Sequence, residues 1–266
     1  MLAAILVCGA SMFTSCLNDT SDNPVTPVEP DLNVAEKIIG KWISADGDGL
    51  PVVTNEKLVL DFVSPTKAFV SASFSHHPAS GMPWMNMLET DVAIDGNKMT
   101  LTTKYDQTTT AVNVYTITAI NGKEFSATLK FSMQVNGNEV LSKTYPVRYV
   151  KVDADYSKAI LGTWEGKVTS ENDEYTDGEL HRWEYKADGT YTYYVKNGDQ
   201  WVASANTLNE YFVAGNLLCF RWVDNGVENR EWWEITIQDG VMKWTALRKK
   251  ADGTTYTATF EMTKVE

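Results

Sequence analysis

Most of the chain alternates apolar and polar residues with a period of two, which is the pattern of β-strands that bury one face. Turn signals such as the Asn-Gly pairs at 121–122 and 136–137 separate the alternating segments and favour hairpins between neighbours. In the first half, strands are predicted near residues 41–46, 56–63, 67–75, 88–94, 98–104, 111–119, 123–134 and 140–151. The second half again holds about eight such segments. We expect two antiparallel meanders, each closed into a barrel that removes its exposed edges.

Both halves begin with the same short motif. The sequence IIGKW at residues 38–42 returns as ILGTW at residues 160–164, and the two Trp residues are 122 positions apart (164 − 42). A short helix-like lead precedes each copy, with Asn33 and Asp155 as candidate N-caps. The repetition predicts two domains of one kind, at residues 34–153 and 154–266.

A helical lead, a Gly-x-Trp motif on the first strand and a long antiparallel meander together resemble the lipocalin superfamily, and in particular the lipocalin-like domains of bacterial outer-membrane lipoproteins. The resemblance implies an all-β fold with two tandem eight-stranded antiparallel lipocalin-like β-barrels. In this family the Trp closes the base of the barrel, and a basic residue of the last strand packs across it. The structural residues would be Gly40, Trp42, Gly162 and Trp164, with Lys151, Lys264 and Arg148 as the basic candidates.

The N-terminus has the character of an export signal. Residues 1–15 carry no charge, and their apolar stretch is too short to span a bilayer as a helix. They lead into Phe13-Thr14-Ser15-Cys16, which resembles the lipobox of bacterial lipoproteins, although a Phe stands where Leu is usual. This resemblance implies a signal peptide at residues 1–15 and a lipid on Cys16, and a simple secretory signal is the alternative. Residues 16–33, with three prolines, would form a flexible tether.

Localisation and excluded partners follow from the anchor and the charge. The resemblance implies attachment to the outer membrane of the cell envelope, on either its periplasmic or its surface side. The formal net charge of −12 argues against nucleic acid as a partner and against docking on anionic lipids through a basic patch. Once Cys16 is lipidated and the signal peptide removed, Cys219 is the remaining cysteine, so no intrachain disulfide would form.

The two predicted interiors differ in side-chain size. The second half places large aromatic residues on its inward face: Trp183, Tyr185, Tyr191, Tyr193, Phe220, Trp222, Trp233, Tyr256 and Phe260. The inward candidates of the first half are smaller: Ala68, Val70, Ala72, Phe74, Phe125, Ala127, Leu129, Phe131 and Met133. An eight-stranded barrel has room for its own side chains or for one small ligand. A packed core is the favoured interpretation for both units, and the first is the better candidate for a cavity.

The sequence contains no recognisable catalytic site. His76 and His77 are adjacent at the end of a strand, so their side chains cannot easily share one metal, and His181 has no ligand partner at a suitable spacing. An acidic cluster lacks the spacing of a calcium-binding loop: Glu171, Asp173, Glu174, Asp177 and Glu179. We therefore expect no enzyme, no metal and no cofactor. A hydrolase that uses unpaired carboxylates is the least favoured alternative.

The leading functional hypothesis is a non-enzymatic binding or interaction module for a small apolar molecule, a glycan or an envelope protein. A structural or assembly lipoprotein without a small ligand is the alternative. Aromatic residues expected on outer faces or in loops suit sugar or protein contacts. The candidate ligand-binding residues of this kind are Trp84, Trp201, Tyr194 and Trp232.

Overall fold

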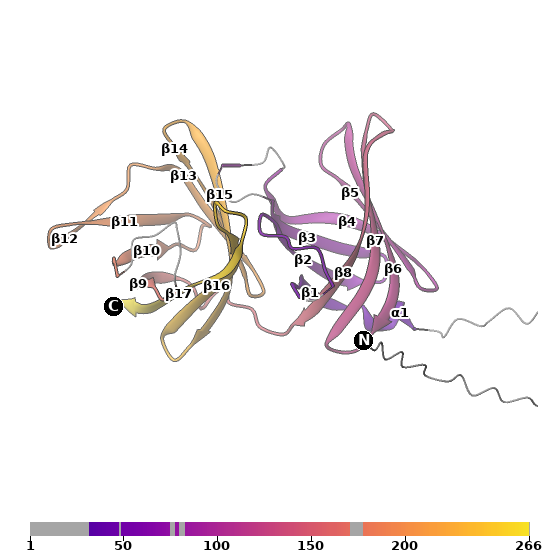
Figure 1. The fold of residues 1–266 in the computed structure, drawn as a ribbon, viewed down its shortest axis with the longest axis horizontal. Helices are drawn as coiled ribbons and strands as arrows, with labels where there is room; N and C mark the ends of the chain where they lie inside the picture. The colour runs from indigo at the N-terminus through magenta and orange to yellow at the C-terminus, as the bar shows by residue number, and fades with distance from the viewer. Residues whose placement is uncertain (1–31, 48, 75–77, 80–82, 171–177, 266) are drawn as a thin grey trace, which may run out of the picture. The chain divides into compact units, whose positions relative to one another are not determined.

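The computed structural model describes residues 32–47, 49–74, 78–79, 83–170 and 178–265 (Figure 1). Residues 1–15, Cys16, the pair at 76–77 and most of the acidic cluster lie outside this part of the chain. The helix α1 (Val34–Lys37) comes first. The strands of the first sheet are β1 (Gly40–Ser44), β2 (Lys57–Ser64), β3 (Lys67–Ser73), β4 (Met85–Asp95), β5 (Lys98–Lys104), β6 (Thr109–Ile120), β7 (Glu124–Val135) and β8 (Asn138–Val152).

The first sheet is a closed antiparallel barrel in the order β1 to β8, which confirms the eight strands predicted from the alternation (Figure 1). Closure comes from β1, which pairs with β2 on one side and with β8 on the other. Trp42 therefore has Leu60 and Lys151 as its Cα partners. Inward-facing residues of all eight strands form one core, so the barrel has an interior separate from solvent.

The second sheet has nine strands and stays open between two of them. Its strands are β9 (Gly162–Val168), β10 (His181–Tyr185), β11 (Tyr191–Asn197), β12 (Gln200–Ala203), β13 (Thr207–Ala214), β14 (Leu217–Asp224), β15 (Val227–Gln238), β16 (Val241–Lys249) and β17 (Thr255–Val265). In the order β12-β11-β10-β9-β17-β16-β15-β14-β13, the strands β12 and β13 are the edges. A single bridge between Thr190 and Glu210 joins the two sides. The all-β fold with two barrel-like units is confirmed, but the second unit has nine strands where about eight were expected, and its sheet is not closed.

The repeated motif has the same geometry in both units. Trp42 and Trp164 are buried, and each indole N–H donates to the carbonyl of the residue four positions earlier, at 2.5 Å and 2.6 Å. The ammonium groups of Lys151 and Lys264 lie 5.5 Å and 5.4 Å from the centres of these rings. Arg148, the other basic candidate, instead donates to the carbonyl of Asp46 at 2.8 Å.

The glycine of the motif is required by its backbone and by this lysine. Gly40 and Gly162 have φ angles of +117° and +108°, which L side chains rarely adopt. A Cβ at either position would lie 3.2 Å or 3.1 Å from the Cε of the lysine that crosses the Trp. Each Gly-x-Trp motif therefore lets the last strand's lysine approach the backbone of the first strand.

The two leads differ from the prediction. The first is a helix, but Asn33 has a left-handed backbone, and its side chain caps no backbone N–H of α1. The second lead is a turn and not a helix, with Asp155 accepting from the Ser157 N–H at 3.0 Å. Asp155 also pairs with Lys41 of β1 at 3.1 Å. Asp155 therefore contacts the first barrel in addition to its own turn.

The outer face of β13 to β15 is covered by the first barrel. Phe212, Cys219 and Trp232 lie in one row across these strands and are buried in a core that includes Ile43 and Val59 of the first sheet. All four residues from 217 to 220 are therefore buried, whereas strict alternation predicts every second one. The alternation fails here because both faces of β14 are packed.

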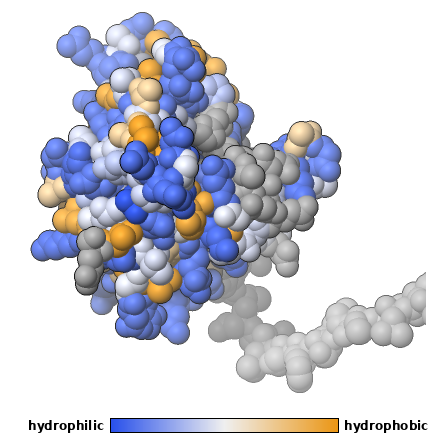
Figure 2. Space-filling model, turned by 90° about the vertical axis from the view of Figure 1, so that its left-hand side faces the viewer, coloured by the Kyte–Doolittle hydropathy of each residue, from blue (hydrophilic) through white to orange (hydrophobic). Residues whose placement is uncertain are grey.

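Outside these contacts the surface is polar. The face drawn in Figure 2 carries mostly hydrophilic residues with hydrophobic ones scattered among them, in keeping with the net charge of −12. Among the described residues, no helix has the length and apolar character needed to cross a membrane.

A candidate ligand cavity in the first barrel

The packed core that the sequence favoured for the first barrel is wrong, because this barrel contains a cavity, in the unit that was the better candidate for one. The cavity has a volume of about 300 Å³, at the lower end of the range for small-molecule sites. Strands β2 to β8 all contribute to its lining. The apolar lining residues are Leu58, Leu60, Val70, Phe74, Met85, Leu129, Phe131, Met133 and Leu141, and the polar ones are Asn55, Glu56, Thr103, Tyr105, Asn113, Tyr115, Lys143 and Tyr145.

A group of packed aromatic rings reaches the cavity through Tyr115. Trp42 contacts Phe125 edge-on with 5.2 Å between ring centres, and Phe125 stacks on Tyr149 at 4.7 Å. Tyr115 packs against this group and is itself a lining residue, and its hydroxyl lies 3.3 Å from that of Tyr149. The Trp of the repeated motif is therefore linked to the cavity lining through Phe125 and Tyr115.

Polar side chains also line the cavity, and several of them reach solvent. Lys143 is exposed, whereas Glu56, Tyr105 and Tyr145 are partly buried. Tyr105 directly follows β5. Lys143 and Tyr145 are two residues apart on β8, so their side chains lie on the same face of that strand. A molecule in this cavity would meet apolar and aromatic groups as well as polar ones.

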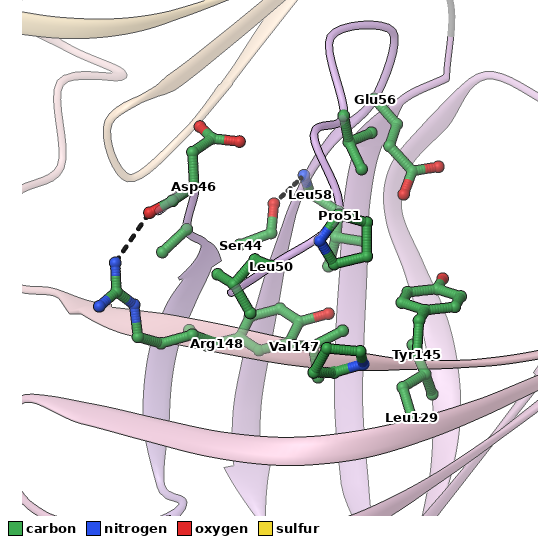
Figure 3. A pocket seen from close by; sticks show the side chains of 14 residues that line it. Ser44, Asp46, Leu50, Pro51, Glu56, Leu58, Leu129, Tyr145, Val147 and Arg148 are labelled. Carbon is green, nitrogen blue, oxygen red and sulfur yellow. Dashed lines mark hydrogen bonds between the residues drawn. The ribbon is translucent and has the colours of Figure 1, made fainter. Parts of the chain in front are cut away.

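The segment between β1 and β2 contributes to a smaller cavity next to this one. Leu50, Pro51, Leu58 and Leu129 line this second cavity of about 60 Å³ (Figure 3). Glu56 and Tyr145 line both cavities. The Glu56 side chain extends toward Tyr145 in this view, and Asp46 is held by the Arg148 hydrogen bond (Figure 3). The Arg148 hydrogen bond thus holds the start of the segment at Asp46, and Glu56 at its end lines the cavity of the barrel.

The charges of the polar lining residues are shaped by burial. Desolvation raises the pKa of Glu56, and the nearby Lys143 ammonium lowers it by a smaller amount. Desolvation, followed by the charge of Glu56, raises the pKa of Tyr105 and of Tyr145 to about 12. Both hydroxyls are therefore neutral around pH 7 and remain able to donate hydrogen bonds. Among the residues that line the cavity, Glu56 is the one carboxylate.

The four aromatic candidates do not form one site. Trp84 is partly buried against Phe212, with ring centres 4.9 Å apart, and the Arg221 guanidinium lies 5.1 Å from its ring. The expectation that Trp232 is exposed is wrong, because this side chain is fully buried beneath the first barrel. None of the four lines the cavity of the first barrel.

Trp201 and Tyr194 lie together on the second sheet. Arg182 stacks 4.6 Å from the Trp201 ring, and the Tyr194 hydroxyl donates to Glu184 at 2.9 Å. Both aromatic side chains are partly buried. Their polar partners are already supplied by the second sheet itself, so they form a packed outer face of β10 to β12.

Two other candidate groups are enclosed. His181 is buried, and its Nδ1 lies 2.7 Å from the Tyr193 hydroxyl. Burial lowers the pKa of His181 and raises that of the Cys219 thiol well above its usual value. The described residues contain no group of three or more His, Cys, Asp or Glu that could hold a metal ion.

Sequence reasoning found apolar walls of the cavity but not its polar lining. Val70, Phe74, Leu129, Phe131 and Met133 were predicted to face inward, and all five line the cavity. Glu56 and Tyr105 lie just outside a strand, where alternation gives no direction, and Lys143 and Tyr145 lie on β8, whose inward face was not assigned from the sequence. The sequence analysis did not single out Glu56; the signal that could have found it is a glutamate directly before an alternating apolar strand.

Comparisons with known proteins give no family for this chain. No family model matches it, and no curated protein matches it. Three solved structures show a weak likeness. A DUF3598-family protein of unknown function from Nostoc punctiforme is 10% identical, with 90% of this chain and 100% of that one covered and a TM-score of 0.25. Transferrin binding protein B from Haemophilus parasuis is 9% identical, with 79% of this chain and 54% of that one covered and a TM-score of 0.23. A putative AttH from Nitrosomonas europaea is 10% identical, with 91% of this chain and 99% of that one covered and a TM-score of 0.24. Such values identify no relative, so the function has to be inferred from the residues of this chain.

Proposed function

We propose that this protein is a non-enzymatic binding module of the cell envelope, and that its first barrel holds one small amphipathic molecule. The observation that carries the proposal is the cavity of about 300 Å³ inside the closed barrel. Its lining is largely apolar and aromatic, so it favours the apolar part of a ligand. The polar side chains of the lining would hold the polar end and fix its orientation.

A neutral apolar dye tests this proposal. N-phenyl-1-naphthylamine, whose fluorescence rises in apolar surroundings, should bind the full chain saturably and one molecule per chain. Val70 lines the cavity and is buried, so Val70→Trp should fill the space and abolish binding. Val63, on the neighbouring strand β2, is 51% exposed, so Val63→Trp is the matched control and should leave binding unchanged.

Two results would contradict the proposal. The wild-type chain could show no saturable binding of the dye, or Val70→Trp could bind it as tightly as wild type does. Circular dichroism and the denaturation midpoint of both variants establish that each is folded. A loss of binding then reports the occupied cavity rather than a lost fold.

We also propose that a lipid on Cys16 anchors the chain to the outer membrane. The support is the resemblance of residues 13–16 to a lipobox and the proline-containing segment that follows. In the native host, Cys16→Ser should move the protein from the membrane fraction to the soluble fraction, and wild type should take up labelled fatty acid. A Cys16→Ser variant that stays in the membrane fraction, with no label on wild type, would exclude the anchor. The outcome is independent of the dye experiment.

A further inference from the structure

The polar residues that line the cavity differ strongly in how much water surrounds them. Glu56 is partly buried where it lines both cavities of the first barrel. Within the described part of the chain, its carboxylate has no hydrogen bond and no close ion pair. Lys143, the cation among the lining residues, is exposed on β8, and its charge remains hydrated. The cavity therefore contains a partly desolvated negative charge that the exposed Lys143 compensates only in part.

Aromatic rings surround this carboxylate. Tyr105, Tyr115 and Tyr145 line the same cavity, and the charge of Glu56 acts on all three hydroxyl groups. Phe74 and Phe131 add two more rings to the lining. The faces of aromatic rings attract organic cations, most strongly where water is excluded. A buried carboxylate lacks compensation until a positive charge pairs with it.

We infer that the ligand of the first barrel is an organic ammonium with an apolar tail, whose cationic end pairs with Glu56 among the tyrosine rings. This inference rests on the proposed function and specifies the chemical class of its ligand. The raised pKa of Glu56 agrees with it, because desolvation has already weakened the hydration of the carboxylate. The net charge of −12 further favours the approach of cations over that of anions.

An anionic ligand would fit the site less well. Its head would lie in the field of Glu56 and would depend on Lys143, whose ammonium is solvated and whose flexible stem must be ordered to make a contact. The tyrosine hydroxyls are able to donate to an anion, but hydroxyl donors do not remove the repulsion by a carboxylate in the same cavity. The site therefore favours a cation in both its charge and its lining.

Three probes of equal chain length test the inference by displacing N-phenyl-1-naphthylamine from the full chain. They are octylammonium, octanol and octanoate, each used below its micelle concentration. Octylammonium should displace the dye at a concentration on the order of tenfold lower than octanoate. Glu56→Gln should remove this gap, so that octylammonium and octanoate displace the dye at similar concentrations. Lys143→Gln should widen the gap, because it removes the opposing charge.

The outcomes separate the ligand class from the binding function. If octanoate displaces the dye as well as octylammonium does, or if Glu56→Gln keeps the wild-type preference, the cation inference is wrong and the cavity remains a binding site. If the dye does not bind wild type saturably, the proposed function is wrong and the inference is overturned with it. A preference for octanoate that Lys143→Gln abolishes would identify an anion site instead.

Discussion

The two units begin with the same motif and end with the same lysine, yet the first contains a cavity and the second packs large aromatic rings in its interior. In the second unit Trp244 lies at the centre of a group of rings, with Trp183, Trp233 and Phe260 at 4.9 Å, 5.2 Å and 5.5 Å between ring centres. The corresponding interior of the first unit has alanine and valine on β3 and a cavity of about 300 Å³. The difference in side-chain volume, on one common framework, decides which barrel can accept a ligand.

The second unit also buries two charged side chains of opposite sign in its interior. Arg248 and Glu231 are buried in a pair with 3.6 Å between nitrogen and oxygen. The Arg248 guanidinium also lies 4.6 Å from the Trp233 ring and donates to the carbonyl of Trp232 at 2.7 Å. In the first barrel, by contrast, Glu56 faces a cavity without such a partner in the described residues. One barrel uses its buried charge internally, and the other leaves it available for a ligand.

The largest expected effect concerns the feature that the barrels share. Trp164→Ala should destabilise the second unit by about 3–5 kcal/mol, because it removes a fully buried ring and leaves a cavity. Trp42→Ala should do the same to the first unit. Trp201→Ala, at a partly exposed position, is the control and should cost far less. Denaturant titration gives the free energies, and a loss well under 1 kcal/mol for Trp164→Ala would rule out its role as the structural plug.

The next prediction concerns the interior volume. Val70→Phe should be tolerated in the first barrel with a cost under about 1 kcal/mol, since the added ring enters existing space. Ala246→Phe, inside the second unit, should cost about 1–3 kcal/mol because its neighbours have no room to move. Equal costs at the two positions, measured by denaturant titration, would show that the barrels do not differ in packing.

Much of this contrast was predictable from alternation alone. Period-two patterning gave all eight strands of the first barrel and the aromatic interior of the second, because one face of each strand is buried. It failed at Trp232 and Cys219, where a second buried surface depends on contacts between residues far apart in the chain. The polar lining residues Glu56 and Tyr105 were also missed, since residues just outside a strand have no fixed facing direction.

The next prediction concerns Lys57, which forms ion pairs with both units, and the expected loss of stability is smaller. Lys57 is 3% exposed, and its ammonium lies 2.9 Å from Asp46 of the first barrel and 2.7 Å from Glu234 of the second. Lys57→Met should cost about 1–3 kcal/mol and separate the unfolding of the two units into distinct steps. Both carboxylates keep contact with water, with side chains 39% and 31% exposed, so the loss stays below that of a fully buried pair.

Lys67→Met is the matched control for this change. Lys67 pairs with Glu89 at 2.9 Å on the surface of the first barrel, with both side chains well exposed. Its removal should change the free energy of unfolding by less than about 1 kcal/mol and leave the number of unfolding steps unchanged. Circular dichroism and tryptophan fluorescence followed in one denaturant series distinguish the two cases. Coincident transitions in Lys57→Met would show that other contacts suffice to couple the barrels.

The smallest expected effect is a gain of stability from Glu56→Gln. Burial raises the pKa of Glu56 in the folded state above its value in the unfolded chain, so the folded state binds the proton more readily. The stability contributed by this group is fully present below the unfolded pKa and is lost as the pH rises through the folded pKa. At neutral pH, wild type therefore carries the cost of a desolvated carboxylate that Gln removes. The variant should have the higher denaturation midpoint at neutral pH, and this advantage should shrink as the pH falls into the acidic range. Glu89→Gln, at an exposed position on β4, should show no comparable gain. A Glu56→Gln variant that is less stable than wild type at neutral pH would mean that the carboxylate is already compensated within the protein, and the site would then have no charge left to offer a cation.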